Sequence, residues 1–241
     1  MLGTAPVIDR VHGEREVGLL NLDRVVPQIE VMAREQAHQL GTLPARLDAG
    51  LAQWRVVAAE PQPALVRTLR ILYGRDADVT IEPVAVGRTA GTVELKLNID
   101  NPTVSTASDD FVAAARGARG WDGQAWTGRV AVPMTTLDAL IARHGEPAFI
   151  KIDVEGFEAE ALAGLTHPPP ALSFEFTTIQ RAVAFAALER CVALGFERFD
   201  AALGESQTLV HGAWRPADEM RRWLADLPDD ANSGDIYAVR P

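Results

Sequence analysis

The chain of 241 residues has a single cysteine and no apolar run of the roughly 18–20 residues that a membrane-spanning helix needs. One cysteine, Cys191, excludes an internal disulfide framework and is typical of a reducing compartment. Its neighbours Leu188, Val192 and Leu194 favour a core position on a helix over a nucleophilic role. The N-terminus also lacks the basic start and apolar stretch of a secretory signal, so we expect a cytoplasmic protein that does not bind membranes.

Several catalytic motifs are missing as well. The chain has no Gly-x-x-x-x-Gly-Lys phosphate loop and no Gly-x-Ser-x-Gly nucleophile elbow, which argues against kinases and serine hydrolases. Its five histidines lack the spacing of a metal-binding motif such as His-Glu-x-x-His. The adjacent acids Asp109 and Asp110 are typical of a solvated helix start. We therefore predict no metal site.

Positive charge is in deficit, with 23 Lys and Arg residues against 33 Asp and Glu residues and a formal net charge of −10. Because like charges repel, nucleic acid and anionic membranes are poor partners for such a chain. A small neutral or cationic molecule is a better candidate ligand. The apolar content of 47% is enough for a substantial core.

Short β-branched and aromatic runs alternate with helical segments through residues 54–241. Strands are predicted at 55–59, 79–86, 149–154, 172–176, 196–200 and 235–239. Helices are predicted at 62–73, 136–144, 157–164, 179–194 and 216–227. This order predicts one α/β domain with a doubly wound, mostly parallel sheet and helices on both faces. The long polar connection before the last strand allows a reversed edge strand.

The segment 91–132, here called the insert, interrupts this alternation. A strand-like stretch and a short helix at 109–115 are followed by regularly spaced glycines and by Trp121 and Trp126. Long loops inside compact domains are commonly functional, so one interpretation is a substrate-facing lid in which both tryptophans contact the substrate. The other is a hairpin whose tryptophans cover one edge of the sheet.

The most informative stretch, residues 149–165, is an apolar run that ends abruptly in carboxylates and a glycine. Asp153 and Glu155 are two residues apart, on the same side of the predicted strand, and Gly156 marks the change from strand to helix spacing. Ligands of open α/β sheets bind outside the carboxyl ends of the strands, so both acids are candidate site residues. The alternative is that one of them only caps the following helix.

Two further acids end predicted strands. Glu175 lies near the end of the predicted strand 172–176, at the same edge of the sheet as Asp153 and Glu155. It is a candidate base or substrate-binding group, or alternatively a helix cap. Glu60 ends the strand at 55–59, where Pro61 stops it. An acid in that place of a nucleotide-binding unit can accept hydrogen bonds from both ribose hydroxyls.

The run IKIDVEGFEAEALAGL at 150–165 resembles the signature of the FkbM family of S-adenosylmethionine-dependent methyltransferases. The surrounding pieces follow the same order as in the family: WRVVAAEPQPALVRTL, VTIEPVAVG, NPTVSTAS, VPMTTLDALI, ALSFEF and SGDIYAVR. The resemblance covers about residues 54–241 and implies a Rossmann-like methyltransferase fold, with residues 1–53 as an atypical helical segment.

The resemblance also implies a cofactor, S-adenosylmethionine, and the residues that bind it. Glu60 would bind the ribose, Ala85 and Val86 would lie beside the adenine, and Asp153 would line the cofactor pocket, with Glu155 as the weaker candidate. The substrate would be a hydroxylated small molecule such as a sugar or a secondary metabolite.

Methyl transfer to a hydroxyl requires alignment of three atoms and removal of one proton. Asp153, Glu155 and Glu175 are the candidate catalytic residues, because burial can raise the pKa of a carboxyl into the range of a useful base. By resemblance to the family's corresponding loop, Asn101 and Ser105 are candidate contacts to the acceptor.

The glycine-rich turn that should precede Glu60 is missing. Its nearest counterpart is the segment 7–13, in which Val11 and His12 stand where the family has glycine and alanine. Residues 22–40 instead predict an amphipathic helix. Three explanations remain open: a divergent cap with a degenerate loop, a replacement that abolishes cofactor binding, or an artefact such as a shifted reading frame.

The missing turn motivates a second hypothesis, a non-catalytic methyltransferase-like scaffold that binds a partner but no cofactor. A third, a nicotinamide-dependent oxidoreductase, requires the same glycines and leaves the acidic motif at 150–165 unexplained, so it ranks last.

Overall fold

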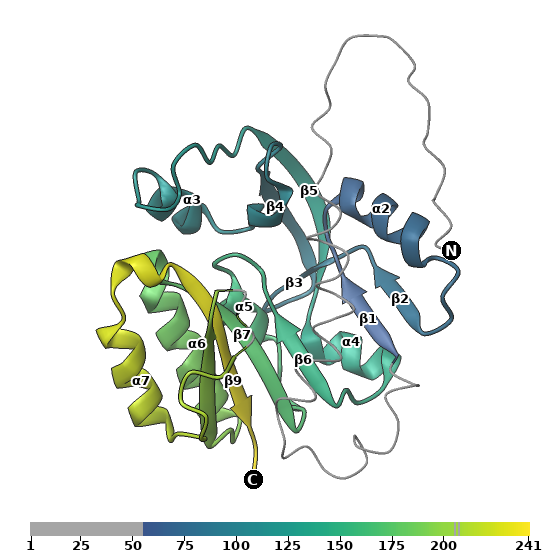
Figure 1. Ribbon diagram of the computed structural model, residues 1–241. Coiled ribbons are helices and arrows are strands. Elements are labelled where there is room, and N and C mark those ends of the chain that lie inside the picture. Colours follow the sequence, from purple (N-terminus) through teal and green to yellow (C-terminus); the bar gives the residue numbers. More distant parts are fainter. Residues whose placement is uncertain (1–54, 205, 207) are drawn as a thin grey trace, which may run out of the picture.

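The computed structural model describes residues 55–241 except 205 and 207, and shows a mixed α/β architecture (Figure 1). The strands are β1 (Val56–Ala59), β2 (Val79–Glu82), β3 (Ala85–Val86), β4 (Gly91–Leu97), β5 (Gly128–Thr135), β6 (Phe149–Ile152), β7 (Ala171–Thr177), β8 (Arg198–Leu203) and β9 (Ser233–Val239). The α-helices are α2 (Pro63–Tyr73), α3 (Asp109–Ala115), α4 (Leu137–His144), α5 (Glu158–Ala163), α6 (Arg181–Ala193) and α7 (Ala217–Asp226). Short 3-10 helices span Pro102–Val104, Thr178–Gln180 and Asp229–Ala231. The helix predicted at 22–40 and the segment 7–13 lie outside the described residues.

A four-stranded sheet with the order β6-β7-β9-β8 forms the centre of the C-terminal half. β6 and β7 are parallel, whereas β9 runs antiparallel to both of its neighbours, β7 and β8. The reversed strand is therefore inside the sheet, and the prediction of a reversed edge strand is wrong. The sequence of β9 agrees with an interior place, because its residues from Ile236 to Val239 are buried on both faces.

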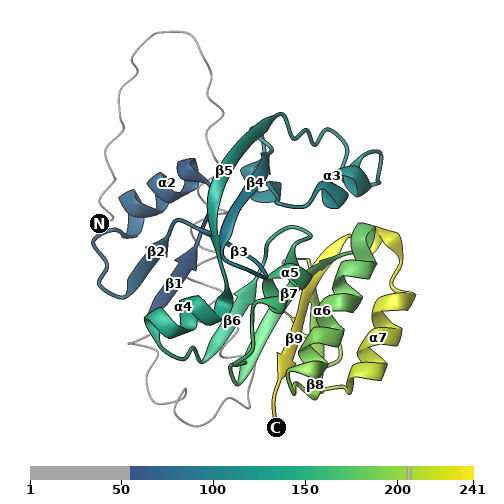
Figure 2. The same cartoon turned by 180° about the vertical axis from the view of Figure 1, so that it is seen from behind.

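One face of this sheet carries the main core. α5, α6 and α7 cover it, and α6 and α7 stand side by side at the same flank of the sheet in Figure 2. The core includes Ile152, Leu172, Phe174, Phe176, Phe199, Ile236, Leu162, Leu188, Cys191, Met220 and Leu224. Cys191 is fully buried in α6, which confirms its prediction as a core residue, and burial raises the pKa of its thiol far above the usual range.

The strands of the N-terminal part form a separate pair. β1 and β2 are parallel, α2 packs beside them, and Glu82 at the end of β2 binds Arg143 at 2.7 Å and His144 at 2.6 Å on α4. Across the described ranges, no strand joins this pair to β6. The predicted α/β class is thus confirmed, while a single doubly wound sheet is not what these residues show.

The insert forms most of the third sheet, with the order β3-β5-β4. The predicted strand at 79–86 is divided into β2 and β3, because Pro83 cannot donate a ladder hydrogen bond. β4 and β5 pair antiparallel from Gly91–Met134 to Leu97–Gly128, and α3 with its following loop lies between them in the chain. The insert is therefore a hairpin with a helical excursion.

No helix among the described residues is long and apolar enough to cross a bilayer.

The chain after β3 and the end of α5 lie in close contact at two glycines, Gly87 and Gly164. A Cβ atom built on Gly164 would lie 2.3 Å from the carbonyl oxygen of Gly87, whereas one built on Gly91 would meet nothing within 4 Å. We expect Gly164→Ala to lower the free energy of unfolding by about 1–3 kcal/mol through overpacking. Gly91→Ala is the matched control and should change it by less than about 0.5 kcal/mol. Urea denaturation measures both, and equal stabilities of the two variants would contradict the contact.

Candidate active site

A strained turn connects the end of β6 to α5. Glu155 has a positive φ of 54°, which is unusual for a residue other than glycine, and Gly156 follows with a φ of 83°. The hydroxyl of Thr106, in the insert, donates a hydrogen bond of 2.6 Å to the carbonyl oxygen of Glu155. The insert therefore holds the strained residue in place.

Gly156 is required by the packing around this turn as well as by its backbone conformation. An added Cβ would lie 2.1 Å from Oε1 of Gln180 and 2.7 Å from the ring of Phe111 in α3. The insert thus packs directly on the turn, in agreement with its position over the ends of β6 and β7 in Figure 1.

Three carboxylates meet at this corner, and we call Asp153, Glu155 and Glu175 the acidic cluster. One oxygen from each lies within 4.8 Å of the others. Asp153 and Glu155 come from the turn after β6, and Glu175 from β7, opposite Asp235 of β9. Their strands present these acids on the face of the sheet that α5, α6 and α7 leave free.

Lys151, two residues before Asp153, supplies an ammonium to this corner. Its Nζ lies 3.2 Å from Oδ2 of Asp153 and 3.3 Å from Oδ2 of Asp235. Burial by itself lowers the pKa of Lys151, but the carboxylates of Asp153, Asp235 and Glu175 outweigh it and raise that pKa. Lys151 therefore stays protonated and ties β6 to β9.

The environment of Glu155 and Glu175 is unfavourable for charged carboxylates. Burial, and next the negative charge of Asp153, raise the pKa of Glu155 and of Glu175 well above the usual range of a carboxyl. Within the part of the chain that the structure describes, the buried Oε2 atoms of both residues accept no hydrogen bond. Perturbed, unsatisfied carboxyls of this kind are typical of functional sites.

Glu158 is a fourth buried acid, at the first residue of α5. Its Oε1 accepts backbone hydrogen bonds from Val154 at 3.2 Å and from Gly156 at 3.1 Å, so its role is to fix the turn. Burial nevertheless raises its pKa to about 7.

Glu60 lies where the sequence predicts it, directly after β1. Its Oε1 accepts a hydrogen bond of 2.6 Å from the backbone N–H of Gln62, and burial raises its pKa to about 7. The side-chain amide of Gln62 in turn donates to the carbonyl oxygen of Pro102 in the insert, at 3.1 Å. Ala85 and Val86, the predicted adenine neighbours, form β3 and pair with β5.

The four predicted substrate residues all lie in the insert, where each has a partner within it. Asn101 shares Oε1 of Gln124 with Asn98, and the hydroxyl of Ser105 accepts the N–H of Asn98. The indole of Trp126 donates to the carbonyl oxygen of Val104.

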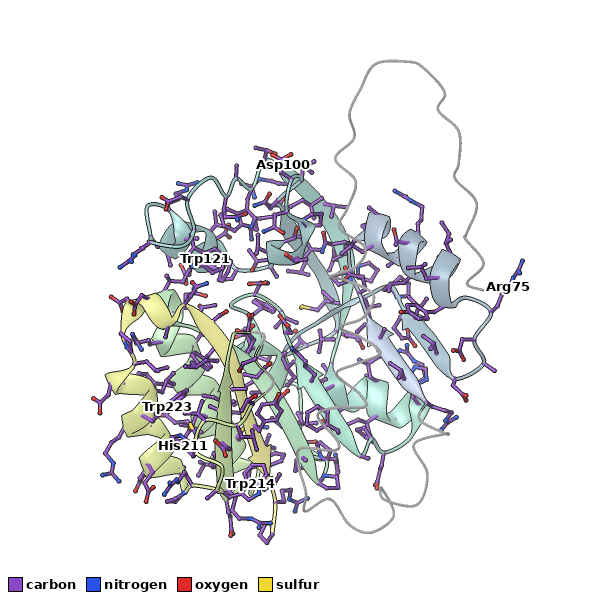
Figure 3. All side chains as sticks on the ribbon, viewed as in Figure 1. Arg75, Asp100, Trp121, His211, Trp214 and Trp223 are labelled. Carbon is purple, nitrogen blue, oxygen red and sulfur yellow. The ribbon has the colours of Figure 1, made fainter. Side chains whose placement is uncertain are left out.

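Trp121, labelled in Figure 3, is 8% exposed and meets Phe111 of α3 edge to face at 5.1 Å. Trp126 approaches the same ring at 6.0 Å. Both tryptophans therefore pack on α3 and build a small core inside the insert. The interpretation that they cover one edge of the sheet does not describe this arrangement.

Lys151, Glu158 and Asp235 are the residues of this corner that the sequence analysis does not single out. The alternation of Lys151 with Asp153 places both on one face of a strand and is a signal for Lys151. Asp235 carries no such signal, because its place beside Glu175 follows from the pairing of β7 with β9.

A sequence profile of the Methyltransferase FkbM domain matches residues 38–227, more than half of the chain. The chain belongs to the FkbM methyltransferase family. This membership confirms the resemblance that the motif at 150–165 carries, and it identifies the α/β unit as a methyltransferase domain. No curated protein and no solved structure matches the chain.

The raised pKa of Glu158 predicts a pH-dependent stability. Between pH 4.5 and about 7 the unfolded chain releases this proton while the folded protein keeps it, so the free energy of unfolding falls as the pH rises through that window. Glu158→Gln keeps the hydrogen-bond acceptor but cannot ionise, and it should remove up to about 3 kcal/mol of this fall. Urea denaturation at several pH values between 4.5 and about 7 measures this fall in the free energy of unfolding. Exposed Glu94, replaced by Gln, is the control, and a slope unchanged in Glu158→Gln would disprove the assignment.

Proposed function

We propose that this FkbM-family protein is an S-adenosylmethionine-dependent O-methyltransferase that acts on a hydroxyl of a small molecule, such as a sugar or a secondary metabolite. The observation that carries the proposal is the acidic cluster at the carboxyl ends of β6 and β7, the edge at which α/β enzymes bind ligands. The net charge of −10 agrees with a neutral acceptor and a cationic cofactor.

The residues around this edge fit the cofactor's chemistry. Glu60 is a half-buried carboxyl at the end of β1 and suits the ribose hydroxyls, which would donate to it. Val86, which is only partly buried, would offer apolar surface to the adenine, whereas Ala85 is buried in the sheet and would support it from behind. Asp153 would face the ammonium and the sulfonium charge, with Glu155 behind it.

When bound, S-adenosylmethionine supplies a methyl group on a positively charged sulfur. Glu60 and Asp153 would hold the cofactor, and its methyl group would pass to the acceptor oxygen, with S-adenosylhomocysteine as the leaving product. The hydroxyl proton passes to a carboxylate of the acidic cluster, for which Glu155 and Glu175 are the candidates. Burial and the negative charge of Asp153 raise the pKa of both carboxyls, which makes each of them a stronger base than an ordinary carboxylate.

The insert supports a role in choosing the acceptor. It contacts Glu60's neighbour Gln62 through Pro102, and the acidic turn through Thr106. The insert therefore contacts both regions that would bind the cofactor, and its polar residues Asn101 and Ser105, which lie next to these two contacts in the chain, are the candidates for binding the acceptor. Trp121 and Trp126 would then act by holding the insert in shape.

The proposal is tested by binding of S-adenosylhomocysteine, the demethylated product, in isothermal titration calorimetry. We expect the wild type to bind, and Glu60→Ala and Asp153→Ala to bind at least about tenfold more weakly, because each loses a hydrogen bond to a charged group. Glu94→Ala, a surface acid paired only with Arg129, is the control and should bind like the wild type. Absence of binding by the folded wild type would reject the proposal in favour of a non-catalytic scaffold.

A further inference from the structure

We infer that the acidic cluster is a binding site for one divalent metal ion of the Mg²⁺ or Mn²⁺ type. The site itself is argued from the geometry of Asp153, Glu155 and Glu175. Only the assignment of the ion to the methyl acceptor rests on the proposed function.

The distances within the cluster suit a small hard cation. Ligand oxygens that bind Mg²⁺ at about 2.1 Å lie roughly 3–4 Å from one another in an octahedral shell. The three carboxylates each contribute an oxygen within 4.8 Å of the other two, so small side-chain adjustments complete one face of such a shell. The sequence does not reveal this set, because its three acids come together only when β6 and β7 pair.

A cation would offset the energetic cost of burying two of the carboxylate oxygens in the cluster. Oε2 of Glu155 and Oε2 of Glu175 are both buried, and the structure describes no residue that donates a hydrogen bond to either one. A buried carboxylate oxygen without a donor is costly, because it has lost its water and gained nothing in exchange. Both residues belong to the same cluster, so one ion there would coordinate both carboxylates and offset their burial.

The charge balance of the acidic cluster also favours a bound cation. Lys151 supplies a single ammonium, which lies beside Asp153 and Asp235. Four carboxylates meet around it when Glu155 and Glu175 are included, so negative charge remains in excess. The strained φ of 54° at Glu155 is maintained in spite of this repulsion.

The cluster also leaves room for further ligands of the ion. The side chain of Asp153 is 41% exposed, in contrast to 17% for Lys151 behind it. An ion on the three carboxylates would therefore keep open coordination positions on its outer side. The all-oxygen donor set favours Mg²⁺, Mn²⁺ or Ca²⁺ over Zn²⁺, which prefers nitrogen and sulfur ligands.

In the proposed reaction, the open positions would take the hydroxyl oxygen of the acceptor. Coordination to a divalent ion lowers the pKa of a bound hydroxyl, so its proton is released to solvent water before or during attack on the methyl group. With the ion bound, the carboxylates would act through it, and the route in which Glu155 or Glu175 accepts the proton would apply only to the metal-free protein.

The experiment is a titration of the metal-free, full-length protein with MnCl₂, followed by electron paramagnetic resonance of free Mn²⁺ and by calorimetry. We expect one bound ion per chain in the wild type. Glu155→Gln and Glu175→Gln keep the side-chain size and should each weaken Mn²⁺ binding at least about tenfold. Asp100→Asn, which removes an acid at the outer edge of the insert (Figure 3), is the control and should bind within about twofold of the wild type.

Thermal unfolding separates loss of the site from loss of the fold. Mn²⁺ should raise the melting temperature of the wild type and of Asp100→Asn, but not that of the two Gln variants, which without metal should melt no lower than the wild type. A wild type that binds no Mn²⁺, or Gln variants that bind it as well as the wild type does, would overturn the inference in favour of a proton shared between Glu155 and Glu175. Binding of S-adenosylhomocysteine is measured on the same samples without metal. Failure of metal binding can therefore be distinguished from failure of the proposed function.

Discussion

Repulsion between carboxylates that the fold holds close together is the constraint on which this corner of the molecule depends. Asp153, Glu155 and Glu175 share a region no wider than 4.8 Å, partly shielded from water. Such crowding raises the pKa of buried acids and reduces stability at neutral pH. Lys151 offsets part of it by pairing with Asp153 and with Asp235 on β9, which lies on the far side of β7. Buried acids retained at such a cost, at the edge where α/β sheets bind ligands, are typical of functional sites.

The insert is the second element on which the site depends. It touches the region of Glu60 through Pro102 and the acidic turn through Thr106, and α3 packs its Phe111 against Gly156. Its own small core of aromatic rings gives it a defined shape. The hairpin therefore contacts the segments that follow β1 and β6, each of which carries candidate site residues.

Local patterns in the sequence predict much of this structure. The bounds of α3 and, within a residue or two, those of β6, β7 and α4 follow from periodicity and capping residues, such as Thr136 before α4 and Ser108 before α3. The strand predicted at 79–86 failed at Pro83, where the chain leaves one sheet and joins another. The interior place of β9 was missed because no local signal states which strand a given strand will pair with.

The sequence by itself determined the family, the alternation of strands and helices, and the positions of Asp153, Glu155 and Glu175 at the ends of strands. These features depend on residues that are close in the chain. Only the tertiary structure decided that the three acids meet and that Lys151 reaches Asp235 across 84 positions of sequence. It also decided that two carboxylate oxygens are buried without a donor among residues 55–241, leaving out 205 and 207. The physical reason is that strand register and burial arise from contacts between distant segments, and those contacts set the charge environment of each group.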